Sequence, residues 1–331
     1  MSIQSSEMIW RHPVERSDAG SNGGRMTATQ IPTSVKNNIW PDVPQSERVA
    51  GSTKYRKVFI HVANDDDLSL VRPRIFVETF TPGDDSITIF KGTATDTQSA
   101  LTGSEQQYGS GDLNVPATAN DMTIQVMTEG VALNYFNDGD LIRISDKANV
   151  SSVGSEEYIV ISGVPTYAGD VATITLATAL VNSYAASGDT RVASVVEGAD
   201  IVSGYSAFTL TGSGAYDDVV YPIITDSIST VEQDWTIFFD TATTYTLTSD
   251  TLGINLSGNI SSDLTPNNPD YTKPYFTMDY RGFSGTFTTG NTITFTTAAA
   301  AVPIWYKRII PAGANSLTGD KVIVAIDGES A

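Results

Sequence analysis

The chain has 331 residues, a formal net charge of −19 and no cysteine. The lack of cysteine excludes disulfides, thiolate nucleophiles and Cys-based zinc sites, and two histidines are too few for a His-rich metal centre. No apolar run approaches the roughly 20 residues of a membrane-spanning helix, and the N-terminus lacks the apolar segment of a signal peptide. We therefore expect a soluble protein that is made in the cytoplasm and has no membrane partner.

The polar composition favours β-structure. Thr, Ser, Gly and Asp dominate, whereas the long side chains that favour helices (Glu, Lys, Arg and Gln) are scarce. Such a mixture is typical of short strands joined by many turns. The length allows two domains and a sizeable core. We predict an all-β protein, with a β-sandwich core, an inserted small antiparallel β-barrel and an extended N-terminal arm.

Residues 1–53 are predicted to form the extended N-terminal arm. Their apolar residues are isolated and show no sustained period of 2 or 3.6, and turn signals such as Gly20–Gly24 interrupt them. Trp10 and Trp40 are costly to leave in water. An ordered arm therefore buries them, either on the body of its own chain or on a neighbouring subunit, and the sequence leaves both possibilities open.

Charge is unevenly distributed along the chain. Residues 1–60 carry eight Lys/Arg and five Asp/Glu, a net +3, so the other 271 residues carry −22. This asymmetry suggests a basic arm that lies on an acidic body, with chance clustering of solvated charges as the alternative. The acidic body argues strongly against nucleic-acid binding, which needs dense Lys/Arg. The predicted inter-subunit contacts are Trp10, Arg11, Arg16, Arg25, Trp40, Lys54, Arg56 and Lys57.

Residues 54–112 are predicted to form the first part of the sandwich core. Three runs rich in β-branched and aromatic residues, at 58–63, 74–80 and 86–90, are separated by an acidic loop and a tight turn. In the second run, Ile75 and Val77 alternate with Phe76 and Glu78. We expect one face of this strand to be buried.

Residues 113–196 are predicted to form the inserted barrel, because five or six short strands alternate with turn signals over about 80 residues. The turn at 137–140 resembles a calcium loop only loosely and fits a solvated hairpin turn better. Residues 197–331 are predicted to complete the sandwich core. Strands are expected there at 205–210, 219–225, 235–239, 244–248, 275–279, 285–287, 292–296, 302–309 and 321–326.

The sequence contains no convincing catalytic motif. A nucleophile elbow and a phosphate-binding loop are both absent. Carboxylate pairs occur at 65–67, 84–85 and 217–218, but all three lie in turn-like stretches where Asp is favoured for its own backbone hydrogen bonds. His61 lies in an alternating run and fits a packed histidine better than a base. We predict no enzymatic activity, no catalytic residue, no metal and no cofactor.

A resemblance to a known family is found within residues 20–92. The runs GSNGGRM, NNIWPDVPQSERVAGSTKYRKVFIHVAND and FVETFTPGDD resemble a virion structural protein of long-tailed bacteriophages, including Mu-like transposable phages, and are most like a major tail tube protein. The closing WYKRIIPAGAN and VAIDGESA fit more loosely, and the middle of the chain is generic. The resemblance implies a location in the virion tail after synthesis in the host bacterial cytoplasm.

For a tail tube protein the resemblance further implies stacked rings of β-sandwich subunits that conduct DNA. The partners would be copies of the chain in trimeric or hexameric rings, other virion proteins, and genomic DNA as non-specifically passing cargo. An acidic body fits a lumen through which DNA slides without sticking. The alternatives are another virion component (head decoration, baseplate or fibre) and a carbohydrate-binding or carbohydrate-cleaving β-protein with exposed aromatics at Tyr271, Tyr275, Tyr280 and Phe283.

Overall fold

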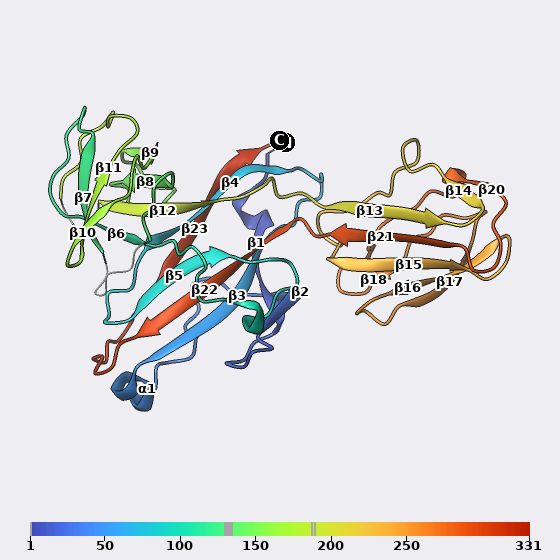
Figure 1. Ribbon diagram of the computed structural model, residues 1–331, viewed down its shortest axis with the longest axis horizontal. Helices are drawn as coiled ribbons and strands as arrows, with labels where there is room; N and C mark the ends of the chain where they lie inside the picture. The colour runs from blue at the N-terminus through green and yellow to red at the C-terminus, as the bar shows by residue number, and fades with distance from the viewer. Residues whose placement is uncertain (1, 129–134, 187, 189) are drawn as a thin grey trace.

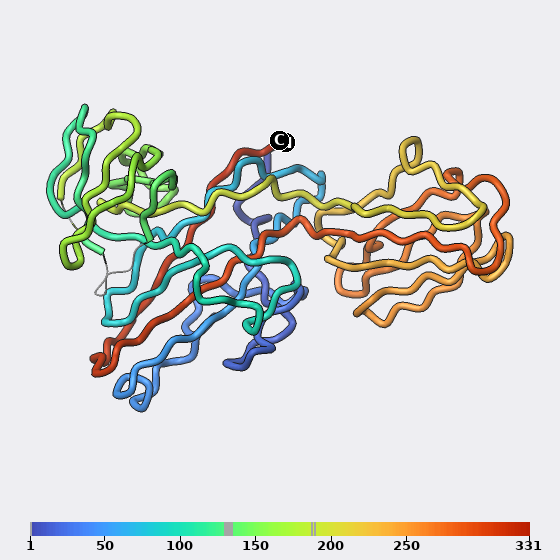
Figure 2. Tube along the Cα trace, viewed as in Figure 1, coloured from blue at the N-terminus to red at the C-terminus, as the bar shows by residue number. Residues whose placement is uncertain are grey.

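The computed structural model describes residues 2–128, 135–186, 188 and 190–331, and it confirms the all-β prediction. Three lobes follow one another along the longest axis (Figures 1 and 2). We name them the central sandwich (2–112, 193–203 and 299–331), the barrel lobe (113–192) and the distal lobe (204–298). Each has a buried apolar cluster of its own.

The first sheet of the central sandwich is antiparallel, in the order β2-β1-β3-β22-β5. Its strands are β1 (Met8–Glu15), β2 (Gly23–Gln30), β3 (Ser52–Val62), β5 (Ser86–Lys91) and β22 (Ala301–Ile310). The middle pair, β3 with β22, runs in register over ten residue pairs without a bulge. Segments more than 200 residues apart in the sequence therefore form the centre of this sheet.

The second sheet of the central sandwich shares strands with the barrel lobe and separates the sandwich core from the core of the barrel. Here β4 (Leu70–Thr79) lies between β23 (Ile323–Ser330) and the end of β12 (Arg191–Glu197). Ile75 and Val77 of β4 enter the sandwich core, whereas Phe76 packs on the opposite face with a separate cluster. Both faces of β4 are buried, which corrects the expectation of one buried face.

The barrel lobe is a small closed antiparallel barrel. Two of its strands, β6 (Ser110–Leu113) and β12, are shared with the central sandwich, and the others are β7 (Thr123–Thr128), β8 (Leu141–Ser145), β9 (Glu156–Val160), β10 (Thr166–Ala168) and β11 (Val171–Thr175). The order β11-β7-β6-β12-β8-β9 closes on itself, because Ile161 bridges to Leu176 beyond the ends of β9 and β11. Closure removes sheet edges, which would otherwise be open to uncontrolled pairing.

The distal lobe is one five-stranded sheet covered on its inner face by long loops. The sheet has the order β13-β21-β15-β16-β17, with β13 (Gly204–Thr211), β15 (Gln233–Phe239), β16 (Thr244–Ser249), β17 (Asn255–Asn259) and β21 (Thr292–Ala298). The cover includes two short ladders, β14 (Gly214–Tyr216) with β20 (Phe283–Gly285) and β18 (Asn267–Asn268) with β19 (Lys273–Pro274). Trp235, Phe239 and Phe287 are among its fully buried aromatics.

Two predicted boundaries need correction. The predicted arm does not extend away from the body: β1 and β2 within it belong to the central sheet, and residues 31–51 form a loop with the short helix α1 (Gln45–Ala50). The region 197–331 does not form one core with 54–112, because residues 204–298 bury a cluster of their own. Local periodicity could not reveal either point, since both depend on which distant strands pair.

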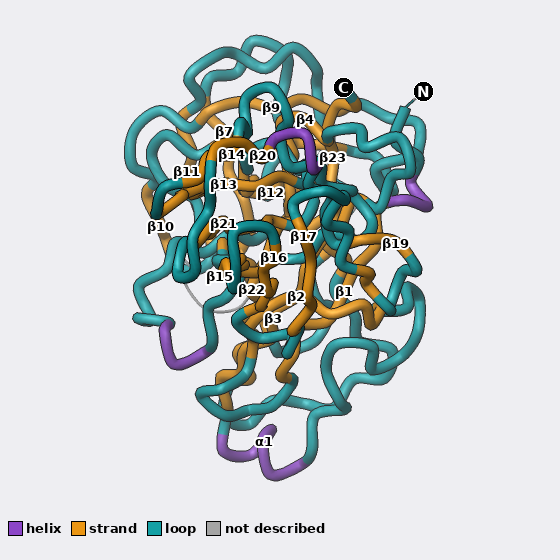
Figure 3. The backbone as a smooth tube through the Cα atoms, turned by 90° about the vertical axis from the view of Figure 1, so that its right-hand side faces the viewer, coloured by secondary structure: helices purple, strands orange, loops and turns teal. Residues whose placement is uncertain are grey.

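The chain ends lie close together, on the side of the molecule away from α1 (Figure 3). The backbone N–H of Ile3 donates to Ser330 Oγ at 3.0 Å, and Ser69 exchanges backbone hydrogen bonds with Ala331. Three short 3₁₀ turns complete the described secondary structure, at Ser5–Glu7, Gln98–Ala100 and Tyr280–Gly282.

Candidate functional site

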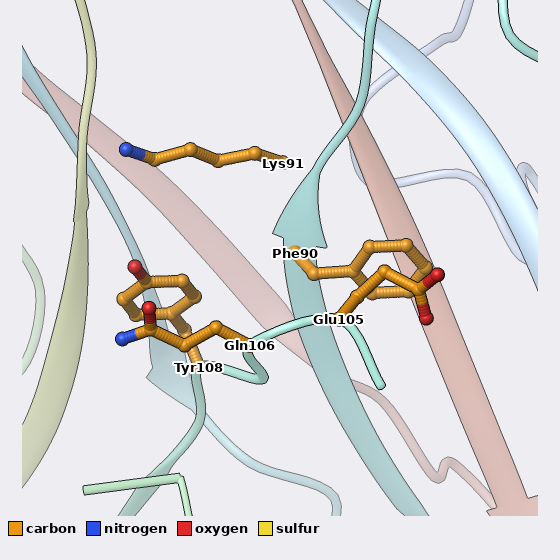
Figure 4. Close-up of a pocket in the computed structure, with 5 residues that line it drawn as sticks. All are labelled: Phe90, Lys91, Glu105, Gln106 and Tyr108. Atoms are coloured by element: carbon orange, nitrogen blue, oxygen red, sulfur yellow. The ribbon is translucent and has the colours of Figure 1, made fainter. Parts of the chain in front are cut away.

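A shallow hollow lies on the central sandwich near the barrel lobe. It measures about 290 Å³ and is lined by Phe90, Lys91, Glu105, Gln106 and Tyr108. Lys91 extends across it and away from the carboxylate of Glu105 (Figure 4). Burial raises the pKa of Tyr108 to about 12, so its phenol stays protonated at neutral pH. The lining offers no nucleophile beside a general base, and we assign no chemistry to this hollow.

A more organised set of polar groups lies where the distal lobe meets the central sandwich. The chain passes between these lobes twice, at 198–203 between β12 and β13 and at 299–300 between β21 and β22 (Figure 1). Three side-chain contacts join the lobes beside these crossings. We call them together the polar junction, and it is the candidate functional site.

His61 is the centre of the first contact. It lies near the end of β3, is 0% exposed and has a partner on each ring nitrogen. Arg11 Nε donates to Nδ1 at 2.7 Å, so the ring proton must lie on Nε2, which donates to the carbonyl of Ser227 at 2.7 Å in the distal lobe. Burial, followed by the charge of Arg11, lowers the pKa of His61 to about 4. The imidazole is therefore neutral at physiological pH.

Arg11 is held in place by both lobes. Its guanidinium donates to the carbonyl of Ala28 at 2.5 Å and lies 5.3 Å from the ring centroid of Tyr271, on the distal lobe. The side chain is only 6% exposed, and burial lowers its pKa. Because β1 and β3 pair directly, with Arg11 opposite Phe59 and Ile9 opposite His61, Arg11 and His61 are diagonal neighbours on the sheet.

The second contact is a charge cluster around Asp226. Lys273 lies 3.0 Å from Asp65 of the central sandwich and 3.0 Å from Asp226 of its own lobe. Asp226 also accepts from the backbone N–H of Ile228 at 2.8 Å, which holds the loop that carries Ser227. Next to this cluster, Asp67 accepts from the backbone N–H of Ser227 at 2.6 Å. Ser227 thus binds the central sandwich through both its carbonyl and its N–H.

The third contact joins β2 to the turn between β16 and β17 of the distal sheet. Arg25 Nη2 lies 2.7 Å from Asp250, and Nη1 donates to Thr251 Oγ1 at 3.0 Å. Arg25 is one of the predicted inter-subunit contacts, and the structure places it in this contact within the chain.

The polar junction can hold lobes together but offers nothing to a substrate. His61 and Ser227 are both 0% exposed, so no substrate reaches them. The sequence prediction of a packed histidine is confirmed. The partner on the distal lobe was missed, because residues 225–230 show only the Asp, Ser and Thr that are typical of a turn.

The other predicted inter-subunit residues are also engaged internally, except one. Lys57 is 1% exposed and lies 2.6 Å from Asp96. Trp40 is 9% exposed, and the guanidinium groups of Arg56 and Arg308 lie 4.8 Å and 4.5 Å from the centroid of its ring. Lys54 pairs with Asp18 and Glu47, Arg56 pairs with Asp18, and Trp10 packs on the sandwich core. Arg16 alone is an exposed side chain of this set. The other basic residues are buried or half-buried, and a basic residue in such a position needs a partner from its own chain.

The predicted carboxylate pairs have structural roles. Asp84 accepts from the backbone N–H of Asn315 at 2.7 Å, and Asp217 accepts from that of Val220 at 2.9 Å. Burial and the neighbouring carboxyl of Asp320 raise the pKa of Asp85 to about 7. Within the part of the chain that the structure describes, no three His, Cys, Asp or Glu residues are grouped to hold a metal ion.

No protein-family model matches the chain, and no curated protein matches it either. In the described residues, no helix is long and apolar enough to cross a membrane. The likeness of residues 20–92 to phage virion proteins therefore stays a hypothesis.

Proposed function

We propose that this chain is a bacteriophage virion structural protein, and specifically a major tail tube protein that assembles into stacked rings. The observation that carries the proposal is the polar junction, in which buried His61, Arg11 and Ser227 join the central sandwich to the distal lobe. Such a network fixes the geometry between lobes and performs no chemistry. A subunit of a load-bearing assembly needs rigidity of this kind.

An open sheet edge supplies a surface for assembly. In the described part of the chain, β23 pairs with β4 on one side and has no ladder on the other. The register of β23 with β4 has two irregularities, and β23 carries Asp327 and Glu329. Both features oppose nonspecific pairing of an edge strand. An edge strand with these features pairs selectively, for example with the same edge region of another subunit.

The charge of the outer lobes fits a particle that handles DNA without binding it. The distal lobe carries ten Asp/Glu and two Lys/Arg, a net −8, and the barrel lobe carries nine and three, a net −6. Surfaces of this sign repel phosphate and release no counterions on contact with DNA. We propose that genomic DNA is passing cargo only.

The edge assignment can be tested by comparing two exposed apolar residues near the C-terminus. Ile323 lies on β23 and is 37% exposed, whereas Leu317 lies in the preceding loop and is 50% exposed. We expect Ile323→Lys to reduce assembly in light scattering, because a charge on the edge opposes pairing, and Leu317→Lys to leave it unchanged. Equal assembly by both variants would remove β23 from the interface.

A second candidate function, carbohydrate binding, is favoured by the outer face of the distal sheet. Alternate residues of its strands point away from the core and form rows of hydroxyl and amide side chains around Phe238, which is 41% exposed. The rows contain Thr209, Thr211, Thr236, Thr244, Thr246, Thr248, Asn255, Ser257, Asn259, Thr292, Thr294 and Thr296. An aromatic platform among hydrogen-bonding groups suits a neutral sugar polymer.

The predicted sugar-binding aromatics differ from this set. Tyr275 is 6% exposed and belongs to the core, whereas Tyr280 is 44% exposed and lies away from the threonine rows. A glycan array tests the second candidate: retention that is lost in Phe238→Ala but kept in Tyr280→Ala supports it. An array without signal for the unmodified protein removes it.

A further inference from the structure

We propose that His61 is an acid-sensitive latch, which holds the distal lobe against the central sandwich near neutral pH and releases it on acidification. The inference rests on the geometry of the polar junction and does not depend on the proposed function.

The connection between the lobes is narrow enough to act as a hinge. The first crossing is tied to the central sandwich as far as Ile201, which bridges to Leu70, so only 202–203 are left before β13 begins. The second crossing is 299–300, and Ala300 accepts from the backbone N–H of Val62. With two such short crossings, the side-chain contacts of the junction decide whether the lobe is held.

Protonation of His61 conflicts with the contact that now holds it. In the neutral ring, Nδ1 accepts from Arg11 Nε at 2.7 Å while Nε2–H donates to Ser227. A second proton would have to sit on Nδ1, where it would face the N–H of a guanidinium at hydrogen-bonding distance. Two donors and two positive charges would then oppose each other in a site that excludes water.

The charged groups around His61 do not relieve this conflict. Arg11 faces the ring from β1 and lowers its pKa, and Asp226 faces it from the distal lobe and raises it by a smaller amount. Asp226 is already paired with Lys273, which also binds Asp65. Asp67 accepts from the backbone N–H of Ser227, and Asp270 interacts electrostatically with Arg11, whose pKa it raises. In the described part of the junction, no carboxylate is placed to accept a hydrogen bond from a protonated Nδ1 of His61.

The direction of the pH dependence follows from the two states. In the open state the imidazole titrates near its ordinary value of 6.5, whereas in the closed state its pKa is lowered to about 4. The open state therefore binds a proton more readily, and closure is fully favoured above pH 6.5 and weakens as the pH falls toward 4. The difference corresponds to a decrease of up to about 300-fold in the closed-to-open ratio.

The chain is well suited to a direct distance measurement, because it has no cysteine of its own. Spin labels at Val49→Cys on α1 and Val219→Cys on the distal lobe, which are 66% and 87% exposed in the unmodified protein, report the separation of the lobes. We expect the distance distribution to broaden between pH 6.5 and 4. The near-ultraviolet circular dichroism, to which the buried Trp235 of the distal lobe and the buried Trp305 of the central sandwich contribute, should stay unchanged over that range.

Two variants separate the latch from general acid unfolding. His61→Gln retains a donor and an acceptor but does not titrate, so its distance distribution should not respond to pH. Arg11→Met removes the opposing charge, so the pKa of His61 in the closed state should rise toward its open-state value and the response of the distance distribution to pH should become smaller. The inference is overturned if the unmodified protein stays closed down to pH 4, if His61→Gln opens in the same window, or if the near-ultraviolet signal disappears together with the distance change.

Discussion

Replacement of Lys57 tests whether the basic strands of the first sheet serve the fold or a neighbouring subunit. The side chain is 1% exposed, and Nζ lies 2.6 Å from Asp96 Oδ1 and 2.8 Å from the carbonyl of Gly24. Asp96 also accepts from the indole N–H of Trp305 at 2.8 Å. Burial lowers the pKa of Lys57 against the opposing effect of Asp96, so the ion pair is what keeps the ammonium charged.

The expected cost of Lys57→Met is about 3–5 kcal/mol, because the carboxylate of Asp96 loses its counterion in a buried site. That is a decrease of two to four powers of ten in the folding equilibrium. Asp96→Asn should also destabilise the protein, although its side-chain oxygen can still accept from Trp305. In the double variant, neither charge is left unpaired, so the loss should be smaller than the sum of the two single losses by at least about 1 kcal/mol.

Urea unfolding followed by tryptophan fluorescence measures these differences. In a Trp235→Phe background the remaining tryptophans (Trp10, Trp40 and Trp305) all lie in the central sandwich, so the signal reports that lobe. A change below about 1 kcal/mol in Lys57→Met would be far under the range for a buried pair and would refute the internal role. Additive losses in the double variant would show that the two residues do not interact.

Three further outcomes follow from the structure. Gly23→Ala should destabilise the central sandwich by more than about 1 kcal/mol in the same urea assay, because φ is +108° and a Cβ would lie 2.9 Å from the Trp305 ring; a neutral effect would contradict that geometry. Asp85→Asn should raise stability by about 1–2 kcal/mol at pH 8 and change it little at pH 4, because burial and Asp320 raise the pKa of Asp85 to about 7 and its ionised form opposes folding; equal effects at both pH values would exclude this cause. Arg16→Glu should leave thermal unfolding unchanged and reduce assembly in light scattering, since this residue is the exposed member of the predicted contact set; unchanged assembly would remove it from the interface.

Local sequence patterns predicted much of the central sandwich. The runs at 58–63, 74–80, 86–90 and 302–309 correspond to β3, β4, β5 and β22, because β-branched and aromatic residues with short turns between them leave few alternatives. Patterns failed where a strand is short or irregular. The strand expected at 219–225 is a turn that contributes a single bridge at Ile224.

The polar junction could not be predicted in the same way. Arg11, His61 and Ser227 are separated by 50 and 166 residues, and only the sheet order brings them together. The sequence likewise showed that residues 1–60 carry an excess of basic side chains, but not which acidic residues they pair with. The ion pairs with Asp96 and Asp250 depend on long-range strand pairing, which periodicity does not encode. Charge counts therefore predicted an interface, whereas the structure shows that most of these residues are used within the fold.

Electron microscopy of the purified full-length chain tests the central claim most directly. For a tail tube protein we expect rings that stack into hollow tubes of constant diameter, and averaging of the rings would give their symmetry as threefold or sixfold. Monodisperse single particles with three lobes, at concentrations where light scattering also shows no growth, would contradict an assembling subunit. Flat lattices without a channel would instead place the protein elsewhere in a particle.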